Sequence, residues 1–136
     1  VIFAWHHDVL NILQRGLQHH GLFRIDGTTP ATHRQEYCKT FVADPSKVIM
    51  LGNMQAMGIG TDGLQEVSCH ALLAEPDWVP GNNVQAVDRL DRWGQTGTVQ
   101  ADIFVAPDSI AERILASALK KARNIHASLD CQMDAK

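Results

Sequence analysis

Residues 83–95, with the sequence NVQAVDRLDRWGQ, hold the side chains best suited to binding a charged ligand. Gln85, Arg89 and Arg92 are spaced by four and three positions, so on an α-helix all three project from one face. A guanidinium keeps its charge, and its forked donors match phosphate oxygens. The spacing therefore predicts a helix face that binds a polyphosphate. The alternative is a solvated face on which Arg92 pairs with Asp88.

The same segment predicts how that face is held in place. Ala86, Leu90 and Trp93 repeat the spacing one position further round, which forms an apolar stripe that can pack against the rest of the protein. We expect the helix to span Gln85–Arg92 and to stop at Gly94-Gln95, where a glycine suits a left-handed cap.

A glycine-containing loop, residues 52–64, follows the apolar stretch KVIML. Its glycines allow close approach of the backbone to a ligand, and its amides and hydroxyl can hold phosphate oxygens; the alternative is a glycine-tolerant connection. The chain contains neither a Walker A sequence, GxxxxGK[ST], nor an acidic DExx box after a strand. If the arginines bind ATP, the groups that hold most of the nucleotide must lie on another domain. An arginine supplied from a second domain is known to complete such a site.

The pattern of apolar residues predicts strands that alternate with helices at short intervals. The expected strands are 1–5, 22–25, 47–51, 70–74 and 99–105, and the expected helices are 8–18, 30–41, 85–92 and one that starts after Ser109. Thr29 is expected to cap the second helix, and Ser109 with Glu112 matches a capping box. This order is typical of an α/β domain with a mainly parallel, doubly wound sheet, in which ligands bind beyond the carboxyl ends of the strands.

Composition and charge exclude several classes of protein. A chain of 136 residues with 45 % hydrophobic and 20 % charged residues is expected to form one globular domain. No apolar run approaches the ~20 residues that span a bilayer, so we expect no membrane partner. A net charge of −3 argues against a stand-alone basic nucleic-acid binder, but not against a local patch. Adjacent histidine pairs do not suit one metal site, so we expect no bound metal.

The cysteines and the start of the chain bear on location and domain limits. Cys38, Cys69 and Cys131 are widely spaced and form no CxxC pair, so we expect no disulfide framework and an intracellular compartment, either a bacterial or phage-host cytoplasm or a nucleus. Cys38 and Cys69 are expected in the core. The chain opens on VIFAW without a signal sequence. We therefore expect a piece of a larger protein, with a domain at 1–130 and a frayed tail at 131–136.

Four segments, in order, resemble a known family. They read VIFAWHHDVLNIL, RIDGTTPATHRQEYCKTF, NMQAMGIGTDGL and LLAEPDWVPGNNVQAVDRLDRWGQT. Over residues 1–125 they resemble the second, C-terminal RecA-like lobe of Swi/Snf-type ATPases of helicase superfamily 2. The most specific match is Q-A-x-[DE]-R-x-H-R-x-G-Q at residues 85–95, and the turn at 74–81 is most similar to the annealing-helicase branch. The chain departs from the family pattern at Asp91, Val79 and Met57, where the family carries His, Asn and Gly.

The resemblance implies a RecA-like three-layer α/β/α sandwich and roles for individual residues. Arg92 would be the arginine finger, Arg89 a second contact to the γ-phosphate, and Gln85 a link from the nucleotide to the cleft. The residues implied to border the nucleotide are Gly58, Gly60 and Asp62. The residues implied to face the DNA backbone are Asp26, Gly27, Thr28, Arg34, Asn53, Met54 and Gln55.

The resemblance also implies partners and a reaction. ATP with Mg²⁺ would bind between this lobe and an N-terminal RecA-like lobe of the same protein, which would carry the Walker loop, the metal ligands and the catalytic base. The expected activity is DNA-dependent ATP hydrolysis that drives tracking along duplex DNA, and the isolated lobe is expected to be inactive. One alternative is a lobe of an RNA-directed superfamily 2 helicase. Another is a non-catalytic α/β interaction module in which the arginines pair with Asp88 and Asp91.

Overall fold

The computed structural model describes residues 1–58 and 61–133, with side chains at 1–57 and 61–125. A five-stranded sheet forms its centre, and its strands are parallel in the order β2-β3-β1-β4-β5. The strands are β1 (Ile2–Ala4), β2 (Leu22–Ile25), β3 (Ile49–Asn53), β4 (His70–Leu73) and β5 (Gln100–Ile103). The helices are α1 (His7–Leu17), α2 (Ala31–Ala43), α3 (Pro80–Val87) and α4 (Ile110–Met133), with short 3₁₀ turns η1 (Gln18–His20), η2 (Ala56–Gly58) and η3 (Leu64–Glu66).

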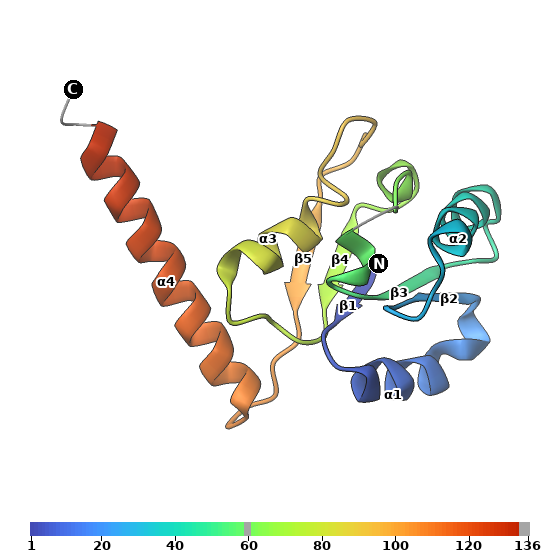
Figure 1. The fold of residues 1–136 in the computed structure, drawn as a ribbon, viewed down its shortest axis with the longest axis horizontal. Coiled ribbons are helices and arrows are strands. Elements are labelled where there is room, and N and C mark those ends of the chain that lie inside the picture. Colours follow the sequence, from blue (N-terminus) through green and yellow to red (C-terminus); the bar gives the residue numbers. More distant parts are fainter. Residues whose placement is uncertain (59–60, 134–136) are drawn as a thin grey trace.

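Helices cover both faces of the sheet (Figure 1). Phe3 and Ala4 are neighbours in β1 and both are fully buried, but in different cores, because successive side chains of a strand point to opposite faces. Phe3 packs in the core that includes Phe41 of α2 and Ala86 of α3, whereas Ala4 packs in the core that includes Leu10 of α1. This three-layer α/β/α arrangement on a parallel sheet confirms the predicted fold class.

The last helix packs against α3 near its start and then extends away from the body of the molecule (Figure 1). Ala118 is buried, and Nζ of Lys121 donates to the carbonyl of Trp78 at 3.0 Å. The predicted capping box is half formed. Oγ of Ser109 accepts from the amide of Glu112 at 3.4 Å, but the Glu112 carboxylate accepts from the amide of Asp108.

Most predicted elements are present with shifted ends. Residues 22–25 form β2 as predicted, whereas the third strand begins and ends two residues later than expected. The last helix continues through residues 131–133 of the expected tail, and residues 134–136 lie outside the described part. The assignment of Thr29 as a helix cap was wrong. Its Oγ1 accepts from the amide of Asp26 at 3.0 Å, and Pro30 occupies the cap position.

The two cysteines with described side chains have different environments. Cys38 is buried in the core under α2, as predicted. Cys69 is exposed, so its assignment to the core was wrong; it lies just before β4, against the backbone of Gly97. Over the described ranges, none of the helices has both the length and the apolar character needed to cross a bilayer.

Candidate nucleotide and DNA site

The segment predicted as one helix, residues 85–92, divides into a helix and a turn. α3 ends at Val87, so of the three phosphate-binding candidates only Gln85 lies within it. In a continued helix the carbonyl of Asp88 would accept from the amide of Arg92, but here it accepts from Nε of the Arg92 side chain at 3.0 Å. The carbonyl of Leu90 accepts from Nε2 of Gln95 at 3.1 Å. These side-chain bonds replace the helical ladder, and the prediction of a helix through Arg92 is wrong.

The apolar stripe beside the arginines is only partly buried. Ala86 and Leu90 are 4 % and 0 % exposed, as predicted for a packing face. Trp93 is 98 % exposed, so its assignment to that face was wrong. The helix has already ended, and the residue after Trp93 turns the chain. Gly94 has a φ of 95°, the left-handed conformation that the sequence predicted for it.

Two glutamines hold the backbone of this turn. Gln95 donates from Nε2 to the carbonyls of Leu90 and Ser68, and its Oε1 accepts from the amide of Gly97 at 2.9 Å. Gln65 is buried, and its Nε2 donates to the carbonyl of Trp93 at 3.4 Å. Sequence reasoning matched Gln95 only as part of the motif and missed Gln65. A glutamine directly after a glycine turn is the signal that could have identified Gln95 as a brace.

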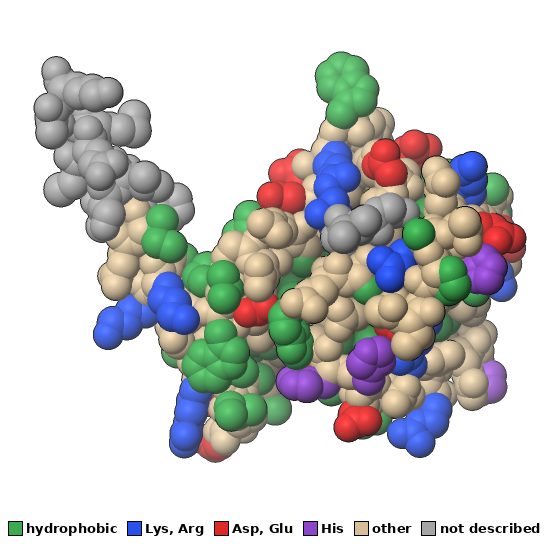
Figure 2. Space-filling view, in the orientation of Figure 1, with side chains coloured by type: hydrophobic (Ala, Val, Ile, Leu, Met, Phe, Trp, Pro, Cys, Tyr) green, Lys and Arg blue, Asp and Glu red, His purple; other side chains and the backbone are tan. Residues whose placement is uncertain are grey.

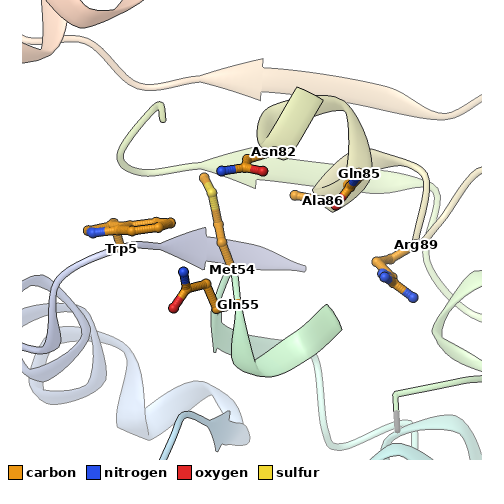
Figure 3. A pocket seen from close by; sticks show the side chains of 7 residues that line it. All are labelled: Trp5, Met54, Gln55, Asn82, Gln85, Ala86 and Arg89. Carbon is orange, nitrogen blue, oxygen red and sulfur yellow. The ribbon is translucent and has the colours of Figure 1, made fainter. Parts of the chain in front are cut away.

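Gln85 and Arg89 face a shared recess of about 340 Å³ (Figure 3). The recess is lined by Trp5, Met54, Gln55, Asn82, Gln85, Ala86 and Arg89. Residues after β1 and β3 thus meet residues of α3 and of the turn that follows it. The structure brings together candidates that the sequence assigned separately to nucleotide and to DNA.

The guanidinium groups of Arg89 and Arg92 form a local positive cluster. Burial lowers the pKa of Arg89 from its ordinary value, and the charge of Arg92 lowers it further, while Asp88 and Asp62 oppose the shift. The Nη1 atom of Arg92 lies 3.9 Å from Oδ1 of Asp62, and the Asp62 side chain is 83 % exposed. Water screens an ion pair so exposed, so Asp62 holds Arg92 only weakly and leaves it available to a more highly charged ligand.

The glycine loop is described in part. Gly58 ends η2, and Gly60 lies outside the described residues. Gly52, the buried first residue of the loop, admits no side chain without rearrangement, since an added Cβ would lie 1.7 Å from Sδ of Met57. Of the three residues predicted to border the nucleotide, only Asp62 has a described side chain, and it lies beside Arg92.

The predicted DNA-facing turn after β2 has two exposed residues and one buried residue. Gly27 and Thr28 are exposed, whereas Asp26 is 6 % exposed and turned inward. Its carboxylate accepts from the amide and hydroxyl of Thr28 and from Nε of Arg24 at 2.6–2.9 Å. Burial would raise the pKa of Asp26, but these hydrogen bonds and the Arg24 charge outweigh it and hold the pKa below its ordinary value.

Two further DNA candidates use their side chains within the protein. The Arg34 guanidinium donates to the carbonyls of Thr29 and Ala56 at 2.8 Å each and of Asp26 at 3.3 Å. Asn53 donates from Nδ2 to the carbonyl of Trp5 at 2.7 Å, and its Oδ1 accepts from the amides of Gln55 and Ala56. These bonds shape the loops around the site. Met54 is 8 % exposed, and Gln55 is left exposed at the recess.

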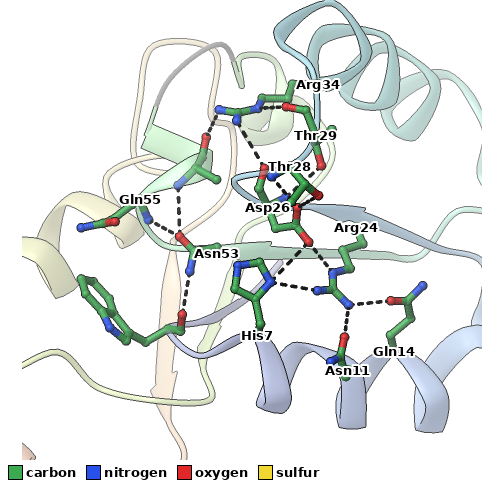
Figure 4. Close-up of polar contacts among 12 residues, drawn as sticks. His7, Asn11, Gln14, Arg24, Asp26, Thr28, Thr29, Arg34, Asn53 and Gln55 are labelled. Carbon is green, nitrogen blue, oxygen red and sulfur yellow. Dashed lines mark hydrogen bonds and ion pairs between the residues drawn. The ribbon is translucent and has the colours of Figure 1, made fainter.

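Sequence reasoning missed one charged residue of this edge, Arg24. Its guanidinium bridges β2 to α1, with donors 2.7 Å from Oδ1 of Asn11 and 2.8 Å from Oε1 of Gln14 in addition to Asp26 (Figure 4). A lone arginine within a short strand, two residues before an acidic turn, is the signal that could have identified it. Within the described residues no cluster of three or more His, Cys, Asp or Glu side chains could hold a metal ion.

Three comparisons place this geometry among known proteins. No protein-family model matches the chain. It is 34 % identical over 134 residues to the helicase ssl-1 of Caenorhabditis elegans, 33 % over 144 residues to the DNA repair protein RAD5 of Saccharomyces cerevisiae, and 36 % over 107 residues to the ATP-dependent helicase brm of Drosophila melanogaster. These alignments cover 96 %, 98 % and 78 % of this chain, but only 5 %, 12 % and 6 % of the relatives.

The crystal structure of the C-terminal part of the Fun30 ATPase domain superposes with a TM-score of 0.78 at 29 % identity, over 86 % of this chain and 38 % of that one. The parallel sheet, the helices on both its faces and this likeness define the chain as a C-terminal RecA-like lobe. With the helicase relatives, they identify it as a lobe of the Swi/Snf type of superfamily 2 helicases and ATPases. The annealing-helicase branch stays a prediction.

Proposed function

We propose that this lobe completes an ATP site whose other half is an N-terminal RecA-like lobe of the same protein, in a DNA-dependent ATPase that tracks along duplex DNA. Arg92 acts as the arginine finger, Arg89 contacts the γ-phosphate beside it, and Gln85 links the nucleotide to the cleft. The Mg²⁺ ligands and the catalytic base belong to the first lobe.

One observation carries this proposal: Gln85 and Arg89 line the same recess as Met54 and Gln55, with Arg92 on the adjoining turn. Two guanidiniums that repel each other, and that Asp88 and the exposed Asp62 only partly offset, favour a ligand with several negative charges. A triphosphate satisfies that condition. Because this side alone leaves the ligand open to water, it needs a second lobe to enclose the phosphates.

The DNA contacts in this proposal come from backbone and small polar groups. Gly27, Thr28 and Gln55 are exposed and flank the braced loops. The Thr28 amide and hydroxyl already donate to Asp26, so the donors proposed for phosphate oxygens are the Gly27 amide and the Gln55 side chain. Such groups bind phosphate without reading base sequence, so we expect low sequence specificity. Asp26, Asn53 and Arg34 shape these loops through bonds within the protein. A nuclear location agrees with a DNA repair protein among the relatives.

Arginine replacement in the full-length protein tests the proposal. Arg92→Ala is expected to lower DNA-stimulated ATP hydrolysis by roughly 10³-fold or more, as the loss of an arginine finger does, with little loss of folding stability. Near-normal turnover would support the non-catalytic interaction module. Stimulation by RNA and not by duplex DNA would support the RNA-directed alternative.

A further inference from the structure

Trp93 stands alone among the large hydrophobic side chains of the described residues. It is 98 % exposed, whereas Trp78 is 47 % exposed and the next most exposed large hydrophobic residue, Ile110, is 70 % exposed. An indole buries more apolar area than most side chains when it packs, so leaving nearly all of it in water is unfavourable. Single exposed hydrophobic residues are common on protein surfaces, but an indole that is 98 % exposed has nearly its whole apolar area available to a partner.

The backbone under Trp93 is fixed, so the indole is presented outward. Gln65 donates to the carbonyl of Trp93, and the amide of Gln95 donates to the carbonyl of Arg92 at 3.0 Å. Gly94 follows with a positive φ that ends the turn. In Figure 1 this turn, between α3 and β5, projects beyond the end of the sheet. Figure 2 shows a hydrophobic side chain that stands clear of the same end of the molecule, next to basic and acidic groups.

Trp93 directly follows Arg92 in the chain, so the proposed role of Arg92 indicates which surface would contact Trp93. The Arg92 side chain folds back toward Asp88 and Asp62 and is 35 % exposed on its side chain. Because Arg92 and Trp93 are consecutive residues of one exposed turn, we infer that a body that brings a phosphate to Arg92 also comes within reach of the indole. Tryptophan is the residue type most enriched among the anchors of protein interfaces.

We propose that Trp93 anchors this lobe to an apolar recess on the first ATPase lobe when nucleotide draws the two lobes together. The proposal rests on the proposed function, because it needs the interlobe ATP site. A protein surface is favoured over a stacked nucleotide base because the indole is bare on both faces, and the described residues provide no second wall that would form a slot for a base.

A direct test follows the indole in the full-length protein. With 5-fluorotryptophan incorporated, the ¹⁹F signal of Trp93 is assigned by its loss in Trp93→Phe. The difference in its chemical shift between H₂O and D₂O is expected to fall when ADP and beryllium fluoride close the lobes. Closure itself is measured independently by energy transfer between a dye on each lobe. Closure with an unchanged shift difference would overturn the inference and leave the proposed function standing. No closure in the wild type would overturn the proposed function itself.

Substitutions at Trp93 distinguish between two roles, an anchor that contacts the first lobe and a residue that stacks on the nucleotide base. Trp93→Ala is expected to weaken closure roughly tenfold or more, as truncation of an interface anchor does, and Trp93→Phe to recover part of it. The matched control is Phe104→Ala, which removes an aromatic side chain that is 65 % exposed just after β5. The lobes of this variant are expected to close normally. The same loss with inorganic tripolyphosphate as with ATP supports the anchor. A loss confined to ATP would show that Trp93 stacks on the base and overturn the proposal.

Discussion

Arg34 and Ala56, 22 residues apart in the chain, are joined by a hydrogen bond of 2.8 Å from the guanidinium to a main-chain carbonyl. The same guanidinium holds the carbonyls of Asp26 and Thr29. One side chain therefore fastens the exposed turn after β2 to the start of the glycine loop after β3. In the proposed ATPase these loops are the DNA side and the nucleotide side of the lobe, so Arg34 is placed to hold the two loops in a fixed relative position.

Replacement of Arg34 by lysine tests this brace. Lysine keeps the charge, but a single ammonium cannot reproduce the planar fork that reaches three carbonyls. We expect Arg34→Lys to lower the free energy of unfolding by about 1–3 kcal/mol and, in the full-length protein, to reduce the stimulation of ATPase activity by DNA more than the basal rate. Denaturant unfolding and ATPase assays with and without duplex DNA measure the two effects.

The opposite pattern for Arg34 would show a different role. If Arg34→Lys keeps its stability and its DNA affinity, while Arg34→Ala loses affinity and the dependence of binding on salt becomes shallower, then Arg34 contacts a phosphate directly.

Asp26 makes stability depend on pH in the acid range. Its pKa in the folded protein is below the ordinary value, so its hydrogen bonds to Thr28 and Arg24 stabilise the fold fully above the unfolded pKa of about 4. This contribution is lost as the pH falls through the lower folded pKa. Asp26→Asn is therefore expected to be less stable than the wild type at pH 7, with a difference that shrinks at pH 3. Urea unfolding at both pH values measures it, and a difference that stays constant would show that the carboxylate charge is not the cause.

Gln95 is expected to affect catalysis without contacting nucleotide. Gln95→Ala removes its bonds to the carbonyls of Leu90 and Ser68 and to the amide of Gly97, which costs about 1–3 kcal/mol of stability. Because the turn then loses its shape, we expect kcat of the full-length protein to fall with Arg92 still present. Gln100→Ala is the matched control, since Gln100 is exposed and its side chain bonds only to Asp102. An unchanged kcat in Gln95→Ala would mean that Arg92 does not depend on this turn.

Local sequence patterns predicted the parts of the fold that short segments determine. The apolar stretches became parallel strands, largely buried in β1 and β3 but exposed in β5, and Gly94 adopts the left-handed conformation expected of a glycine at a helix end. Leu90 lies in the core because it falls on the apolar face set by the spacing of its segment, and Cys38 because a free cysteine packs as a small apolar residue. The motif at 85–95 led to the family, because its residue types are specific even though its expected helical shape was wrong.

By itself, then, the sequence determined the α/β class, the order of the elements and the types of polar residue in the candidate site. The Asp26 and Asn53 loops follow the carboxyl ends of their strands, whereas the turn at 92–95 lies at the amino end of β4, where Gln95 bonds to Ser68. The tertiary structure decided what those residues do there. The side chains of Gln95 and Arg92 donate to carbonyls that would accept backbone amides in a longer helix. The motif is therefore divided into a helix and a turn. Asp26, Asn53 and Arg34 turn inward because loop amides and carbonyls at a sheet edge need partners, and these side chains satisfy them. Trp93 points outward because the turn leaves it no surface among the described residues to pack against.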